Sequence, residues 1–164
     1  LDLMVHDYDY ARWIGGNVKR VYARSVRGTT PDAPGDYALV TLRFANGAIA
    51  HIEGGWAYPA GFFRTSMDIA GTEGVIEYMS DQAQTLHTHL ANPPEEEADE
   101  VAVPAAKAAD SPFTAQLRNF YNAIANDEAP IVTAQEALLA LEVGLAAIES
   151  AKTGKPITLN QEGN

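Results

Sequence analysis

The sequence predicts an α+β domain in which an open, mostly antiparallel β-sheet of six or seven strands is flanked by helices. Two hairpin turns, at Asn46-Gly47 and at residues 71–74, separate short segments in which apolar and polar residues alternate. The last third of the chain changes to the helical spacing of apolar residues. The length of 164 residues suits a single domain with a core of its own.

The first part of the chain predicts one helix and three strands. Residues 1–14 have helical spacing, and the pair Gly15-Gly16 is a stop signal. Residues 18–27 alternate and are rich in β-branched and aromatic side chains, which favours a strand. Residues 37–44 and 48–56 are predicted to pair as a hairpin, because Asn-Gly suits the two positive-φ positions of a tight turn.

The middle of the chain predicts short strands joined by loops. Residues 57–64 form an irregular aromatic loop, and segments 65–70 and 75–78 form the second hairpin. We expect a further strand over 83–90 and a short edge strand over 100–103. The acidic run Glu95–Glu97, which follows two prolines, is typical of a solvated loop and is assigned no function.

Two helices are predicted near the C-terminus. Ser111 is a suitable N-cap with Pro112 at the first helical position, and apolar residues then line one face: Phe113, Leu117, Phe120 or Tyr121, and Ile124. Thr133 and Glu136 form a capping box that begins the second helix, and its apolar stripe is expected at Leu138, Leu141, Leu145 and Ile148. Gly154 and Pro156 end this helix.

Charge and composition exclude several classes of function. The 11 Lys and Arg against 22 Asp and Glu give a formal net charge of -11 at pH 7, which argues against binding to duplex nucleic acid or to an anionic membrane surface. The chain has no cysteine, so disulfides, thiolate metal ligands and thiol nucleophiles are excluded. No apolar run approaches the roughly 18–20 residues of a membrane span, and we expect a cytoplasmic protein.

The start of the chain and its missing motifs point to a larger protein. The sequence opens on Leu1 with helical periodicity under way by Val5, where a domain usually has a loose terminus. It carries no GxGxxG, Walker, HExxH or GxSxG motif and so shows no nucleotide-binding loop of its own. We interpret the chain as a fragment whose N-terminal portion is absent.

Four residues that can carry chemistry share one face of the first predicted helix. Asp2, His6, Asp9 and Trp13 are spaced by four, three and four residues, which places neighbours about 5–6 Å apart at Cβ. A carboxylate one turn before a histidine orients the imidazole and stabilises the imidazolium, as a general base requires. In the simpler alternative, Asp2 caps the helix and bonds to His6 with no substrate involved. One histidine and two carboxylates make a poor metal site.

Structural roles are expected for the other two residues of this face. Trp13 is predicted to pack the helix onto the sheet. Asp9 either reaches the site or pairs with Arg12 or Arg20.

Three motifs resemble the glucose–fructose oxidoreductase, inositol dehydrogenase and rhizopine-catabolism (Gfo/Idh/MocA) family. Residues 2–16, DLMVHDYDYARWIGG, are similar to its Dxxx-HDxDxxRW segment, and residues 69–74, IAGTEG, to its IxGxxG hairpin. Residues 133–143, TAQEALLALEV, and 149–157, ESAKTGKPI, resemble its closing helix and its ES…GKPV tail. The motifs occur in the family's order over nearly the whole chain.

The resemblance implies that this chain is the family's second domain, a substrate-binding and oligomerisation domain like the C-terminal domain of dihydrodipicolinate reductase. It implies an NAD or NADP cofactor bound mainly by an N-terminal Rossmann domain, which also contributes a lysine. Asp2 would bind and orient a substrate hydroxyl, and His6 would accept its proton. The implied reaction is the oxidation of a secondary alcohol of a sugar or polyol, or the reverse reduction, with this fragment inactive alone. The alternative is a non-catalytic ligand-binding or oligomerisation module.

The same resemblance assigns a pocket-lining role to the aromatic loop. Tyr58, Phe63 and Arg64 would line the substrate pocket, although a loop that packs on itself or contacts another subunit is the simpler alternative. His87 and His89 share a strand face without a third ligand, so an exposed strand is favoured over a metal site. An open sheet has a second face to cover, so we expect a homodimer or homotetramer formed through it.

Overall fold

The computed structural model describes residues 3–26, 37–56, 63–81, 86–90 and 111–160. They belong to two compact units, each described by itself. The first unit comprises Leu1–Tyr58 and Pro130–Asn164, and the second comprises Pro59–Ala129. The first unit therefore joins two segments that are distant in the sequence.

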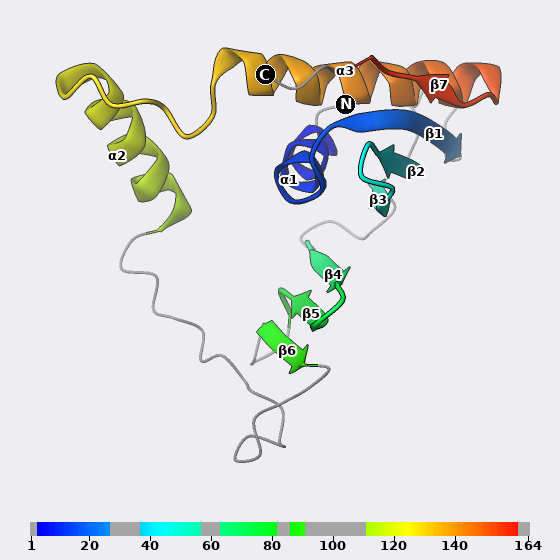
Figure 1. Cartoon of the computed structure of the whole chain (residues 1–164), viewed down its shortest axis with the longest axis horizontal. Helices are drawn as coiled ribbons and strands as arrows, with labels where there is room; N and C mark the ends of the chain where they lie inside the picture. Colours follow the sequence, from blue (N-terminus) through cyan, green and yellow to red (C-terminus); the bar gives the residue numbers. More distant parts are fainter. Residues whose placement is uncertain (1–2, 27–36, 57–62, 82–85, 91–110, 161–164) are drawn as a thin grey trace. The chain divides into compact units, whose positions relative to one another are not determined.

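The first unit is a four-stranded antiparallel sheet with two helices packed on one face. Its strands lie in the order β3-β2-β1-β7, and Figure 1 shows β1 running alongside the long helix α3. The elements are α1 (Val5–Gly15), β1 (Val18–Val26), β2 (Tyr37–Phe44), β3 (Ile49–Gly55), α3 (Ala134–Thr153) and β7 (Ile157–Thr158). Tight turns at Asn46-Gly47 and at the end of α3 use glycines at positive φ, Gly47 at 92° and Gly154 at 69°.

The core of this unit lies between the sheet and the two helices. Every second residue of β2 is buried, as the alternation predicts: Val40, Leu42 and Phe44. These side chains pack with Val21 of β1 and Val143 of α3, which are fully buried. The opposite face of the same strands carries both charged and apolar exposed side chains.

A β-bulge interrupts the regular alternation at the start of β1. Val18 pairs with Phe44, but the next pair along the ladder is Arg20 with Arg43, so Lys19 is an extra residue. The Lys19 carbonyl accepts a hydrogen bond from the Leu159 N–H at 2.9 Å. The bulge therefore turns Arg20 away from the core face that Val18 occupies.

Helix α3 packs mainly through small residues, together with Leu139 and Val143. Its buried face consists of Leu139, Ala140, Val143, Gly144, Ala146, Ala147 and Ser150. The predicted stripe is wrong, because Leu138, Leu141, Leu145 and Ile148 are 37–55% exposed. Small side chains let the helix approach β1 closely, and the larger side chains are left on the outer face.

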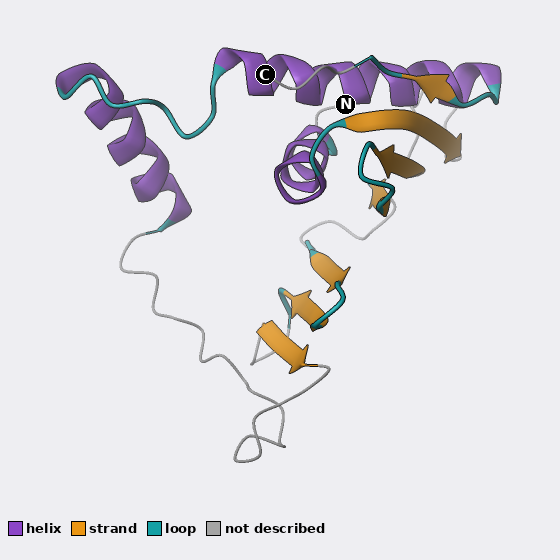
Figure 2. Cartoon of the chain, viewed as in Figure 1, coloured by secondary structure: helices purple, strands orange, loops and turns teal. Residues whose placement is uncertain are grey.

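The second unit contains a three-stranded antiparallel sheet and one helix. The strands β4 (Ser66–Ala70), β5 (Gly74–Met79) and β6 (Leu86–Leu90) lie in sequence order, as Figure 2 shows in orange. Helix α2 (Pro112–Ala125) begins as expected, since the Ser111 hydroxyl accepts a hydrogen bond from the Thr114 N–H. Its apolar residues Phe113, Leu117, Phe120, Tyr121 and Ile124 are 66–77% exposed.

The predicted fold class is confirmed, and the described strands are all antiparallel. The seven strands form two hydrogen-bonded sheets. The two-residue strand β7 was not predicted, because so short a segment carries no alternation. The expected strand at 100–103 and most of the loop at 57–64 lie outside the described residues. No helix in the described part is long and apolar enough to cross a membrane.

Candidate active site

The candidate site lies on α1, whose inner face belongs to the core. Tyr8 is 3% exposed and Met4 is 7% exposed, and the Tyr8 hydroxyl donates to Met4 Sδ at 3.7 Å. Burial, with a smaller contribution from the Asp7 carboxylate, raises the pKa of Tyr8 to about 12. The tyrosine is therefore a neutral core residue at ordinary pH.

Two glycines let the ends of α1 contact the sheet closely. A Cβ on Gly54 of β3 would lie 2.6 Å from Met4 Cγ, and one on Gly15 would lie 2.6 Å from Phe44 Cζ. Real Cβ atoms do not approach other atoms this closely, so both contacts depend on glycine. The N-terminal and C-terminal turns of α1 are thus both fixed against the sheet.

An ion pair fixes the same helix to α3. Arg12 Nη1 lies 2.9 Å from Glu136 Oε2 and 3.3 Å from the Glu136 carbonyl oxygen. The Arg12 side chain is 4% exposed and the Glu136 side chain 51%. Glu136 belongs to the predicted capping box, and its N–H bonds to the Thr133 hydroxyl as expected. Its carboxylate, however, reaches Arg12 on α1.

The outer face of α1 carries His6. The His6 side chain is exposed, and it precedes Asp7, whose pKa is raised by partial burial and lowered to a smaller extent by the His6 charge. Tyr10, four residues after His6, forms a tilted ring pair with Trp13 at 5.7 Å between centroids. An accessible imidazole beside an aromatic surface can accept a proton from a bound hydroxyl group.

The prediction for Trp13 is wrong. Its side chain is 79% exposed and does not pack α1 onto the sheet. The reason is helical phase: Met4, Tyr8 and Arg12, spaced by four residues, occupy the inner face, and Trp13 lies about 100° further round. Tyr10, which the sequence analysis did not single out, lies four residues after His6 on the same helix.

Asp2 lies outside the described residues. The helix begins at Val5, and its N-cap is Met4, which makes no side-chain cap bond. The alternative in which Asp2 is the N-cap therefore does not match the helix start. Asp9 is half-buried on the same helix.

Two predicted pocket residues are described in the second unit, separately from His6. Phe63 is 77% exposed, and Arg64 Nε lies 3.4 Å from Asp81 Oδ2, with both side chains partly exposed. Tyr58 lies outside the described residues. This ion pair links Arg64, at the end of the predicted aromatic loop, to Asp81, two residues after the end of β5.

The strand histidines of the second unit do not form a metal centre within the described residues. His89 Nε2 lies 3.0 Å from Glu77 Oε2 on the neighbouring strand, and the described part of the chain holds no group of three potential ligands. His51, on the sheet of the first unit, lies 3.1 Å from the Thr41 hydroxyl.

The comparisons with known proteins agree on one oxidoreductase family. Residues 1–159 match the model of the oxidoreductase family, C-terminal alpha/beta domain. The chain is 28% identical over 166 aligned residues to the scyllo-inositol 2-dehydrogenase (NAD(+)) of Bacillus subtilis, an alignment that covers 98% of this chain and 47% of that protein. The chain thus spans about half the length of this relative.

Solved structures show the same fold. An oxidoreductase from Agrobacterium radiobacter in complex with NAD+, L-tartaric acid and magnesium is 25% identical, with a TM-score of 0.77 over 96% of this chain and 48% of that one. A levoglucosan dehydrogenase in complex with NADH and L-sorbose is 21% identical, with a TM-score of 0.79 over 98% of this chain and 50% of that one. The second likeness concerns the fold alone.

Proposed function

The chain belongs to the Gfo/Idh/MocA oxidoreductase family as its C-terminal α/β domain, and on that premise we propose that it is the substrate-binding half of a dehydrogenase. The proposed reaction oxidises a secondary hydroxyl of a sugar or polyol to a ketone, or reduces the ketone. The inositol dehydrogenase that matches 98% of the chain supports a cyclic polyol or sugar as substrate.

The observation that carries the proposal is an exposed histidine on a helix fixed at three points. His6 is accessible, while its helix is fixed by Gly54 against Met4, by Gly15 against Phe44 and by Arg12 against Glu136. A general base must be accessible to substrate and yet held in place. In the proposed reaction His6 accepts the hydroxyl proton, and Asp2 binds and orients the same hydroxyl.

The cofactor is NAD or NADP, and it accepts the hydride from the carbinol carbon when bound. This chain has no glycine-rich dinucleotide loop, so a Rossmann domain N-terminal to it is proposed to hold the cofactor and to add a lysine to the site. The fact that the chain spans 47% of its relative supports this arrangement. Tyr58, Phe63 and Arg64 are proposed to line the substrate pocket, with aromatic rings against sugar C–H groups.

The alternative is a non-catalytic module of the same fold that binds a ligand or forms an oligomer. An upstream domain without the lysine or the glycine-rich loop would favour it. In either case the open sheet face is proposed to join copies into a homodimer or homotetramer, because within the described part of the first unit α1 and α3 cover one face of the sheet and no helix or strand covers the other.

The test uses the chain extended at its N-terminus by its own coding sequence. The protein is incubated with NAD or NADP and a panel of cyclic polyols and aldoses, while nicotinamide reduction is followed by absorbance. His6→Ala is compared with His51→Ala, since His51 is also exposed in the first unit but lies on a sheet strand. We expect turnover that His6→Ala lowers by about 10²-fold or more and His51→Ala leaves unchanged.

Three other results would change the proposal. Turnover that survives His6→Ala removes His6 from its role but keeps the enzyme class. Cofactor binding without turnover on any substrate favours the non-catalytic alternative. An extended chain that binds neither NAD nor NADP contradicts the dehydrogenase proposal and leaves the fold as described.

A further inference from the structure

Two arginines face each other directly across the open side of the first unit's sheet. Arg20 of β1 and Arg43 of β2 are register partners, and both side chains are exposed. Like charges directly opposite on neighbouring strands destabilise a sheet. Such a pair therefore needs a partner that offsets the repulsion.

A β-bulge creates this arrangement. Val18 pairs with Phe44 and both are buried, so in a regular strand Arg20 would also point to the core. The extra residue Lys19 reverses the alternation and turns Arg20 to the open face. The bulge is held by the hydrogen bond from the Leu159 N–H to the Lys19 carbonyl. The local backbone thus places the second guanidinium beside Arg43.

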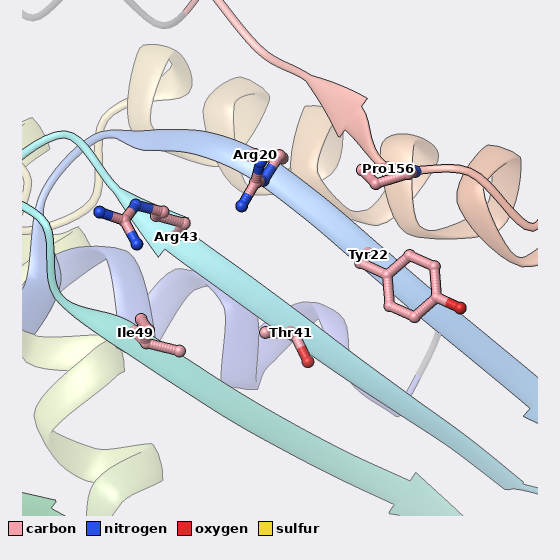
Figure 3. Close-up of a pocket in the computed structure, with 6 residues that line it drawn as sticks. All are labelled: Arg20, Tyr22, Thr41, Arg43, Ile49 and Pro156. Atoms are coloured by element: carbon pink, nitrogen blue, oxygen red, sulfur yellow. The ribbon is translucent and has the colours of Figure 1, made fainter.

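The two side chains line a pocket of about 310 Å³ with Tyr22, Thr41, Ile49 and Pro156. Figure 3 shows the pocket on the sheet of the first unit, with α1 and α3 behind the strands. None of the lining residues is acidic. The Tyr22 hydroxyl accepts a hydrogen bond from Arg24 at 2.7 Å, and the Thr41 hydroxyl lies 3.1 Å from His51 Nδ1. The pocket therefore offers two guanidinium groups and no negative charge.

No carboxylate of the described residues neutralises this pair. The acidic side chain of the same sheet face is Glu53, whose register partner is Leu39. Leu39 lies four residues from Arg43 along β2, a separation of about 13 Å at the rise of a strand. The two guanidinium groups consequently remain without an ion-pair partner in the described part of the chain.

We infer that Arg20 and Arg43 together bind one anionic group, a carboxylate or a phosphate. Guanidinium groups bind both groups through paired N–H donors. A bound anion would convert the repulsion between the arginines into attraction to a common partner. The site lies on the sheet face opposite α1 and His6, so it is independent of the proposed dehydrogenase chemistry. Two sources can supply this group: a free small anion, or an acidic side chain of a second copy of this acidic chain.

The first arm of the test measures a free anion. Inorganic phosphate and citrate are titrated into the protein by calorimetry at constant ionic strength, with Arg20→Gln and Arg43→Gln as test variants. Arg24→Gln is the matched control, because Arg24 lies on β1 and is engaged by Tyr22. If the anion is free, we expect saturable binding whose Kd rises about tenfold or more in both test variants and is unchanged in Arg24→Gln.

The second arm measures self-association by sedimentation equilibrium with and without added phosphate. If the carboxylate comes from a second copy, wild-type protein and Arg24→Gln associate, phosphate reverses the association, and both test variants stay monomeric. Absence of both effects, or equal effects in all three variants, would overturn the inference.

The stability of the variants separates a binding role from a structural one. Without added anion, Arg43→Gln removes a like-charge contact, so its melting temperature should equal or exceed that of the wild type. Added phosphate should raise the melting temperature of the wild type more than that of Arg43→Gln. A clear fall in the melting temperature of Arg43→Gln without anion would show a structural role and contradict the inference.

Discussion

The Ser150 hydroxyl accepts a hydrogen bond from the backbone N–H of Ala23 at 2.9 Å and donates one to the Lys155 carbonyl at 2.7 Å. Strand β7 pairs with β1 at Arg20 and Val21, so Ser150 supplies the bond that the strand edge would otherwise lack at Ala23. The serine is completely buried. The Ser150 side chain thus extends the hydrogen bonding at the edge of the sheet and also holds the turn that follows α3.

Ser150→Ala should lower the free energy of unfolding by about 1–3 kcal/mol, because it leaves a buried N–H and a carbonyl without partners. Denaturant unfolding measures the change. Thr153→Ala is the matched control: its hydroxyl donates to the Glu149 carbonyl on the exposed side of the same helix, and its loss should cost less than about 0.5 kcal/mol. Equal costs in the two variants would contradict the assigned role of Ser150.

Because Arg12 is buried and Glu136 is half-exposed, substituting the two residues of this ion pair should lower the free energy of unfolding by different amounts. Glu136→Gln takes a carboxylate away from a buried guanidinium, which should cost about 2–3 kcal/mol. Arg12→Met leaves only a half-exposed carboxylate and keeps the packing of the stem, so about 1 kcal/mol is expected. Chemical denaturation of both variants checks the order, and a larger loss for Arg12→Met would contradict it.

Tyr8 predicts a loss of stability in alkali. Its pKa is about 12 in the fold against 10.0 in the unfolded chain, so the unfolded state releases this proton first as the pH rises. The protonated phenol stabilises the fold fully below pH 10, and this contribution decreases between about pH 10 and 12, by about 1 kcal/mol at pH 11. The difference in unfolding free energy between wild type and Tyr8→Phe should shrink by this amount between pH 8 and 11. A constant difference would contradict the prediction.

The contact between Gly15 and Phe44 predicts a coupled pair of substitutions. Gly15→Ala brings a methyl group against the Phe44 ring and should cost about 1–3 kcal/mol through overpacking. In a Phe44→Leu background the same change should cost less, with a coupling energy of at least about 0.5 kcal/mol in a double-mutant cycle. Additive costs would show that the ring does not limit this position.

Turn and helix-cap motifs, each formed by a few consecutive residues, predicted the element boundaries well. The Asn46-Gly47 turn fixed a hairpin whose strands begin and end within about a residue of expectation, and Ser111 and Thr133 are the helix caps. Interactions between distant segments could not be predicted this way. Arg12 and Glu136 are 124 residues apart, and the bulge at Lys19 is defined by how β1 pairs with β2.

The candidate site was predictable only in part, because helical spacing gives neighbours on a face but does not tell which face is inward. His6 and Trp13 both lie on the exposed side of α1, where the sequence predicted a packing role for Trp13. The same ambiguity affected α3, whose residues are apolar on more than one side. Hydrophobicity alone selected its leucines, whereas close packing on a sheet selects small side chains.

Helix α3 therefore allows a test of whether hydrophobicity or close packing of small side chains decides which face of a helix is buried. Ala147 is 5% exposed on the face toward the sheet, and Leu145 is 55% exposed. Ala147→Leu makes the helix more hydrophobic but overfills the contact, so it should lower the unfolding free energy by about 1–3 kcal/mol. Leu145→Lys makes the helix less hydrophobic, yet it should change the value by no more than about 0.5 kcal/mol. Thermal or denaturant unfolding of both variants decides between the criteria. A large loss in Leu145→Lys with none in Ala147→Leu would mean that the leucine stripe is the packed face in solution.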